Sequence, residues 1–154
     1  MHKQSVIGLL AGICATAAMA TVLKAGEPSN APASARTVVV PSNVEWTNTR
    51  INVARGQRLR FESTGEVRMS FDASDIAHPA GAVSARHNGS APLAAAPVGT
   101  LIGRVANGQP FSIGDSTNVF EMPASGRLYL GVNDDGVDDN SGNFVVKIWD
   151  SPKP

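Results

Sequence analysis

The chain has 154 residues, which fits one domain, and its 13 basic residues balance 13 acidic ones. A formal net charge of zero argues against a nucleic-acid-binding protein, which needs a basic patch to neutralise phosphates, and gives no reason to expect a polybasic membrane contact. The only cysteine is Cys14. The chain beyond it therefore has no disulfide, thiol nucleophile or cysteine-ligated zinc.

The N-terminal segment has the parts of a secretory signal. A short basic start, His2-Lys3, precedes an uncharged stretch that ends in the small-x-small pattern Ala18-Met19-Ala20. We therefore predict a signal peptide over residues 1–20, export to the periplasm or the medium, and no stable membrane insertion after cleavage. The alternative is an uncleaved anchor, because the apolar stretch extends to Leu23 and approaches the roughly 20 residues that span a bilayer.

Residues 21–36 are rich in Pro, Ser and Ala, which predicts a flexible linker. Beyond it, short runs of alternating or β-branched apolar residues predict strands separated by turns. The predicted strands are Thr37–Val40, Arg50–Val53, Arg58–Glu62, a continuation through Val67, Met69 and Phe71, Leu101–Ala106, Phe111–Ile113, Val119–Met122, Leu128–Val132 and Phe144–Trp149.

This pattern predicts an all-β domain over residues 37–150, an antiparallel β-sandwich of the jelly-roll or galactose-binding type. No long helix is expected, because Pro92 and Pro97 limit the helix formers of Ala91–Ala96 to about one turn. The long segment Asp72–Val98 is an insert between strands. Long ordered loops often carry function, so we interpret this insert as a candidate ligand wall.

An acidic loop, Asn133–Asn140, joins the two strongest predicted strands and holds four of the thirteen acidic residues. Like charges in so short a segment repel one another unless a cation neutralises them. Calcium takes carboxylate, amide and carbonyl oxygens, and this loop supplies all three. Gly136 allows a bend that brings Asp134 towards Asp139 and Asn140, which favours a calcium site. The alternative is a solvated acidic hairpin turn, since Asp, Asn and Gly favour turns.

Two segments around this loop resemble a known family. Leu-Tyr-Leu-Gly-Val-Asn-Asp at Leu128–Asp134 and Asp-Asn-Ser-Gly-Asn-Phe-Val-Val-Lys-Ile at Asp139–Ile148 resemble the C-terminal part of the PA-I galactophilic lectin (LecA-like) family. Gly99–Val105, Ala124–Gly126 and His78-Pro79 extend the resemblance over roughly residues 44–148.

The resemblance implies a small bacterial β-sandwich that binds one calcium ion and, in the lectin members, a galactose coordinated to that ion. The implied ligands of the ion are the side chains of Asp134, Asp139 and Asn140 and the backbone carbonyls of Met69 and Val137 (or Asp138). His78, with Asp134 and Asp139, would bind the sugar. The loop is about two residues shorter here than in the family, and Asp139 stands where the lectin has Asn. A sugar-holding glutamine is replaced near Ala80 or Gly81.

We therefore expect an exported, non-catalytic, calcium-dependent carbohydrate-binding protein for a galactoside or another glycan, with oligomers as a route to avidity. The alternative is a calcium-stabilised structural or interaction domain of the cell envelope. A hydrolase hypothesis rests on Gly114-Asp115-Ser116, which would supply a serine nucleophile. It is weak, because no histidine follows His87 to activate the serine. Trp46 and Trp149 are interpreted as packing residues rather than as a sugar platform.

Overall fold

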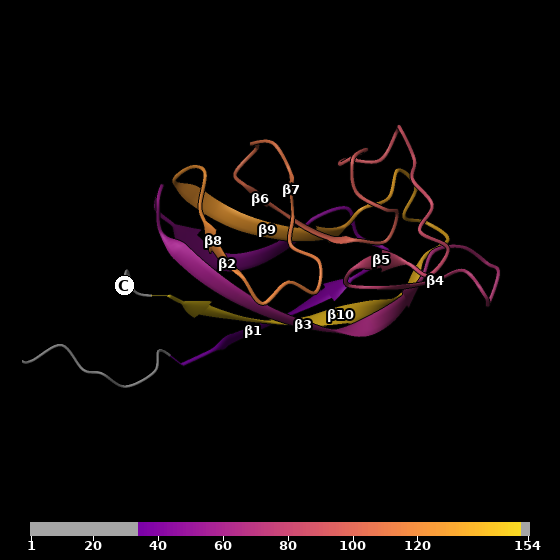
Figure 1. Cartoon of the computed structure of the whole chain (residues 1–154), viewed down its shortest axis with the longest axis horizontal. Helices are drawn as coiled ribbons and strands as arrows, with labels where there is room; N and C mark the ends of the chain where they lie inside the picture. Colours follow the sequence, from indigo (N-terminus) through magenta and orange to yellow (C-terminus); the bar gives the residue numbers. More distant parts are fainter. Residues whose placement is uncertain (1–33, 152–154) are drawn as a thin grey trace, which may run out of the picture. The chain divides into compact units, whose positions relative to one another are not determined.

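A computed structural model describes residues 34–151, which form two antiparallel sheets (Figure 1). The larger sheet has the order β1-β10-β3-β4-β5, with β8 beside β3, and the smaller has the order β2-β9-β6-β7. The strands are β1 Arg36–Pro41, β2 Thr47–Val53, β3 Arg58–Arg68, β4 Ile76–His78, β5 Gly81–Ala82, β6 Leu101–Val105, β7 Phe111–Ser112, β8 Val119–Glu121, β9 Gly126–Val132 and β10 Ser141–Asp150.

The core lies between the two sheets and follows from strand alternation. Alternate residues of two strands are completely buried: Leu59 and Phe61 of β3, and Phe144, Val146 and Ile148 of β10. Leu128 and Leu130 of β9 belong to the same apolar cluster from the opposite sheet. Each such side chain contributes about 1.5–3 kcal/mol by burial. The predicted all-β antiparallel sandwich is confirmed.

The predicted alternation fails at Phe71, which is 89% exposed. β3 ends at Arg68, and the backbone then turns, with the Asp75 amide donating to the Asp72 carbonyl and the Met69 amide donating to the Asp75 carbonyl. Met69 is buried as expected. The turn after β3 therefore removes Phe71 from the periodic surface that the sequence pattern suggested.

The described residues begin within the predicted linker. The predicted signal peptide and most of the predicted linker lie outside residues 34–151, and β1 begins at Arg36, one residue before the expected start of the fold. Within residues 34–151 there is no helix, and so none that is long and apolar enough to cross a membrane. The insert Asp72–Val98 contains the antiparallel pair of β4 and β5, which the sequence did not predict.

The acidic loop passes from one sheet to the other. β9 belongs to the smaller sheet and β10 to the larger, so residues 133–140 form a crossover at one end of the sandwich (Figure 1). A hairpin would require the two strands to pair with each other, whereas β9 pairs with β2 and β6. The alternative prediction that residues 133–140 form a hairpin turn is therefore wrong. Figure 1 shows that the insert lies at the same end of the sandwich.

Candidate functional site

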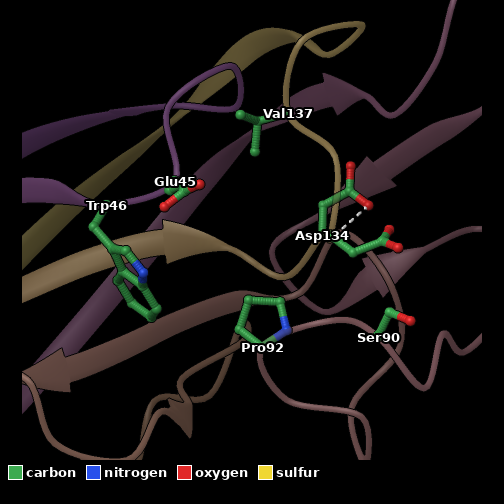
Figure 2. A pocket seen from close by; sticks show the side chains of 7 residues that line it. Glu45, Trp46, Ser90, Pro92, Asp134 and Val137 are labelled. Atoms are coloured by element: carbon green, nitrogen blue, oxygen red, sulfur yellow. Dashed lines mark hydrogen bonds between the residues drawn. The ribbon is translucent and has the colours of Figure 1, made fainter.

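A pocket of about 240 Å³ lies where three segments of the chain meet (Figure 2). The segment before β2, the insert and the acidic loop each contribute side chains to its wall. The lining residues are Glu45, Trp46, Ser90, Pro92, Asp134, Asp135 and Val137. One aromatic ring and three carboxylates thus share a cavity large enough for part of a small polar ligand.

Gly131 of β9 determines how closely the segment before β2 approaches the pocket. A Cβ atom at this position would lie 2.5 Å from the Glu45 carbonyl oxygen and 3.3 Å from the Trp46 ring. Because glycine has no side chain, Trp46 can lie directly against β9 beside the start of the acidic loop.

Asn133 fixes the insert to the acidic loop. Its side chain is completely buried. The Leu93 amide donates to Asn133 Oδ1 over 2.9 Å, and Asn133 Nδ2 lies 3.0–3.2 Å from the carbonyl oxygens of Leu93, Ala96 and Pro97. A second link runs from Asn88 Nδ2 to Asp135 Oδ1, at 2.7 Å. The insert therefore holds one wall of the pocket against the loop that supplies another.

Asp134 and Asn140 meet across the acidic loop. Asn140 Nδ2 donates to Asp134 Oδ2 over 2.8 Å and to the Ser42 carbonyl over 3.3 Å. Flipping the amide would turn its oxygen towards a carboxylate and a carbonyl, both of them acceptors, so the hydrogen-bond network fixes the orientation. Asn140 is 6% exposed, and its Oδ1 is a buried acceptor with no hydrogen-bond partner among the described residues. An unpartnered buried oxygen beside a carboxylate is a ready ligand for a cation.

The Asp134 carboxyl group is half-buried, and its pKa is raised as a result. Burial raises its pKa above the ordinary value of 3.8, against the opposing hydrogen bonds from Asn140 and from the Asp135 amide. The nearby Asp135 carboxylate raises the pKa further. In the absence of a cation, the negative form of Asp134 is therefore less favourable in the folded protein than in water.

The raised pKa of Asp134 predicts a specific pH dependence in the presence of EGTA. The folded state binds a proton at Asp134 more tightly than the unfolded state, so acidification through the raised pKa towards 3.8 stabilises the fold at this site. Denaturation of the wild type and of Asp134→Asn at several pH values isolates this effect. We expect the wild type to gain stability relative to the variant as the pH falls from neutral to about 4. A constant difference would contradict the pKa shift.

The structure brings together some of the sequence-predicted site residues and not others. Asp134 and Val137 line the pocket, and Asn140 bonds to Asp134. Asp139 is half-buried in the turn before Asn140, and His78 is exposed at the end of β4; neither lines the pocket. Within residues 34–151, no three side chains of the His, Cys, Asp and Glu types are grouped to hold a metal. A cation here would depend on amide and carbonyl oxygens as well.

The two backbone carbonyls that the resemblance implies as calcium ligands, those of Val137 and Met69, lie in different surroundings. The Val137 carbonyl already accepts a hydrogen bond from the Asn140 amide at 3.2 Å, which closes the turn around Asp139. Met69 lies in the core and donates its amide hydrogen to Asp75. The roles of these two carbonyls as calcium ligands stay predictions. The same holds for the Asp139 side chain as a calcium ligand and for His78 as a sugar contact.

Part of the pocket wall was not expected from the sequence. The sequence predicts Trp46 as a packing residue, yet this half-buried ring also lines the pocket, and it predicts no individual role for Glu45 or Asp135. Ser90 and Pro92 of the insert line the pocket, and the role of the insert as a ligand wall stays a prediction. No local signal connects Trp46 with residues some ninety positions later in the chain, because the contact depends on how β2 pairs with β9.

Comparisons with known proteins support the fold. The chain is similar to the solved structure of the EclA N-terminal domain, described as a PllA-like lectin, with 23% sequence identity and a TM-score of 0.62. The match covers 75% of this chain and 95% of that one. No protein-family model matches the chain. A search of the curated proteins also found no match. The likeness shows a lectin-like β-sandwich fold, and membership of the PA-I family stays a prediction.

Proposed function

We propose that this protein is a non-catalytic carbohydrate-binding domain that uses a calcium ion held by the acidic loop. The observation that carries the proposal is the pair of Asp134 and Asn140 at the edge of the pocket. Asn140 presents a buried, unpartnered Oδ1, and Asp134 supplies a half-buried carboxylate hydrogen-bonded to the same amide. The lectin-like fold supports the same conclusion.

The chemistry of this donor set fits calcium. An unpaired buried oxygen costs about 1–3 kcal/mol, and a cation removes that cost. Calcium accepts six to eight oxygens in a flexible geometry, so one or two carboxylates can be completed by amide oxygens, carbonyls and ligand hydroxyls. Asp134 and Asn140 would hold the ion with Asp139 and the carbonyls of Val137 and Met69, the set that the family resemblance implies. Zinc prefers nitrogen and sulfur ligands and fits less well.

The pocket next to these ligands suits a sugar. A calcium ion bound from one side keeps positions that hydroxyl groups of a sugar can occupy in place of water. Ser90 and the carboxylates supply hydrogen-bonding groups, and the Trp46 ring adds an apolar surface. We propose a glycan as the ligand, with a galactoside first among the candidates because of the sequence resemblance. His78, exposed on the same insert, is a proposed contact for the part of the glycan outside the pocket.

A second function is favoured by the bonds between the insert and the acidic loop. Asn133 and Asn88 connect the two segments, so a calcium ion could serve only to stiffen this end of an envelope structural or interaction domain. We propose export to the periplasm or the medium in both cases. The two functions differ in whether the pocket binds a glycan.

A glycan array tests this proposal directly. We expect the wild type to bind a subset of glycans in calcium and to lose that binding in EGTA, because the ion contacts the sugar. Asp134→Asn should lose the same signals. Glu121→Gln removes one negative charge from an exposed residue of β8, outside the pocket lining, and should bind as the wild type does. Calcium binding without any calcium-dependent glycan would contradict the lectin function and favour the structural domain.

A further inference from the structure

Arg104 contacts two aromatic rings, one of which lines the pocket. Leu101 and Val105 of β6 belong to the core, so strand alternation directs Arg104 to the opposite face of the sheet. Its guanidinium carbon is 4.3 Å from the centroid of the Trp46 ring and 5.4 Å from that of the Tyr129 ring. Tyr129 is also the residue directly paired with Arg104 in the register of β6 and β9.

One polar atom of the guanidinium group has no hydrogen-bond partner among residues 34–151. Its Nε is buried and makes no hydrogen bond within the described part of the chain, and no carboxylate of residues 34–151 forms an ion pair with it. Arginine stays protonated and has five N–H donors in one plane. The contacts with the two rings use none of these N–H donors, and the side chain is half-buried, so donors of the group can bind a ligand. An arginine held against aromatic rings suits an oxyanion that accepts two hydrogen bonds.

Trp46 connects Arg104 to the pocket. The ring contacts the guanidinium group and also lines the cavity that contains Asp134. Inside the cavity, Glu45 and Asp135 disfavour an anion by charge repulsion. A negative group on a ligand is therefore more favourable outside the cavity, on the Arg104 side of the Trp46 ring, than inside it.

We propose that Arg104 binds an anionic group on the glycan that enters the pocket, so that the ligand class is an acidic oligosaccharide. A neutral sugar residue occupies the pocket, and the neighbouring residue carries a carboxylate or a sulfate ester that accepts hydrogen bonds from Arg104. Trp46 and Tyr129 are positioning residues that hold the guanidinium plane. This inference rests on the proposed function, because it requires a glycan in the pocket.

The test compares matched neutral and acidic oligosaccharides in calcium. The probes are neutral glycans and the same glycans with a uronate or a sulfate ester on one residue, measured at low and high salt. We expect the wild type to bind at least one acidic form about tenfold more tightly than its neutral partner, since a charge-assisted hydrogen bond contributes about that factor. The preference should weaken in high salt. A preference for uronates over sulfate esters, or the reverse, identifies the source of the anion.

Arginine variants connect the preference to this site. Arg104→Gln should remove the acidic preference while neutral glycans bind as before, and Arg104→Lys, which keeps the charge but not the planar donors, should restore it only in part. Arg60→Gln, on an exposed position of β3 in the other sheet, controls for net charge and should keep the preference. Equal affinity of the wild type for both forms, or an equal loss for both in Arg104→Gln, overturns the inference while the lectin function stands. Absence of all glycan binding overturns both.

Discussion

We expect calcium to raise the melting temperature of the wild type, and we expect Asp134→Asn to abolish that rise. At a free calcium concentration a hundred times the Kd, a ligand that binds only the folded state stabilises it by about 2.7 kcal/mol. For a domain of this size, that corresponds to a rise in Tm of roughly 11 °C. The variant loses the carboxylate that bonds to Asn140, and its amide cannot neutralise the ion.

Thermal melts with calcium and with EGTA measure this effect. Glu121→Gln serves as the charge-matched control and should keep the full shift. In EGTA, Asp134→Asn should melt at or above the wild-type temperature, because burial disfavours the negative charge that the substitution removes. A variant that keeps the calcium-induced shift would show that the ion, if bound, is held elsewhere.

Asn133→Ala is expected to lower the free energy of unfolding by about 3 kcal/mol and to release the insert from the acidic loop. The substitution leaves the Leu93 amide and the Ala96 carbonyl without a partner, whereas the Pro97 carbonyl keeps the hydrogen bond from the Thr100 hydroxyl. Each unpaired buried group costs about 1–3 kcal/mol, less what local rearrangement recovers. Ser90 and Pro92 would then move away from the pocket, so glycan affinity should fall as well.

Hydrogen exchange at the Leu93 amide reports the release of the insert. In the wild type this amide donates to Asn133 Oδ1 and should be protected, whereas in Asn133→Ala it should exchange faster. Asn107→Ala, at an exposed turn after β6, is the matched control and should change neither stability nor exchange at Leu93. Unchanged protection of Leu93 in Asn133→Ala would show that other contacts hold the insert in place.

The strands could be predicted because burial in a sandwich repeats every second residue. Leu59 and Phe61, and Phe144 with its alternate neighbours, showed that period in the sequence and are buried. The prediction failed at Phe71, where hydrogen bonds of a turn after β3 override the alternation. The pattern of one strand also contains no information on its partner, and so the assignment of β9 and β10 to different sheets required the structure.

The candidate site also has one part that the sequence could predict and another that it could not. The crowding of carboxylates at Asn133–Asn140 is local, so the sequence could predict an ion there. The wall formed by Trp46 is not local, because it depends on the absence of a side chain at Gly131 and on the pairing of two strands far apart in sequence. The unpartnered Oδ1 of Asn140 depends on Ser42 and Asp134, both of which orient its amide. Such three-way contacts leave no periodic signal in a single sequence.

Anomalous diffraction from crystals of the wild-type protein grown in calcium tests the central claim most directly. We expect a peak about 2.3–2.6 Å from Asn140 Oδ1 and from a carboxylate oxygen of Asp134, a residue of the pocket that Trp46 also lines. A map with no anomalous peak near these two oxygens, from crystals in which calcium is abundant, would contradict it.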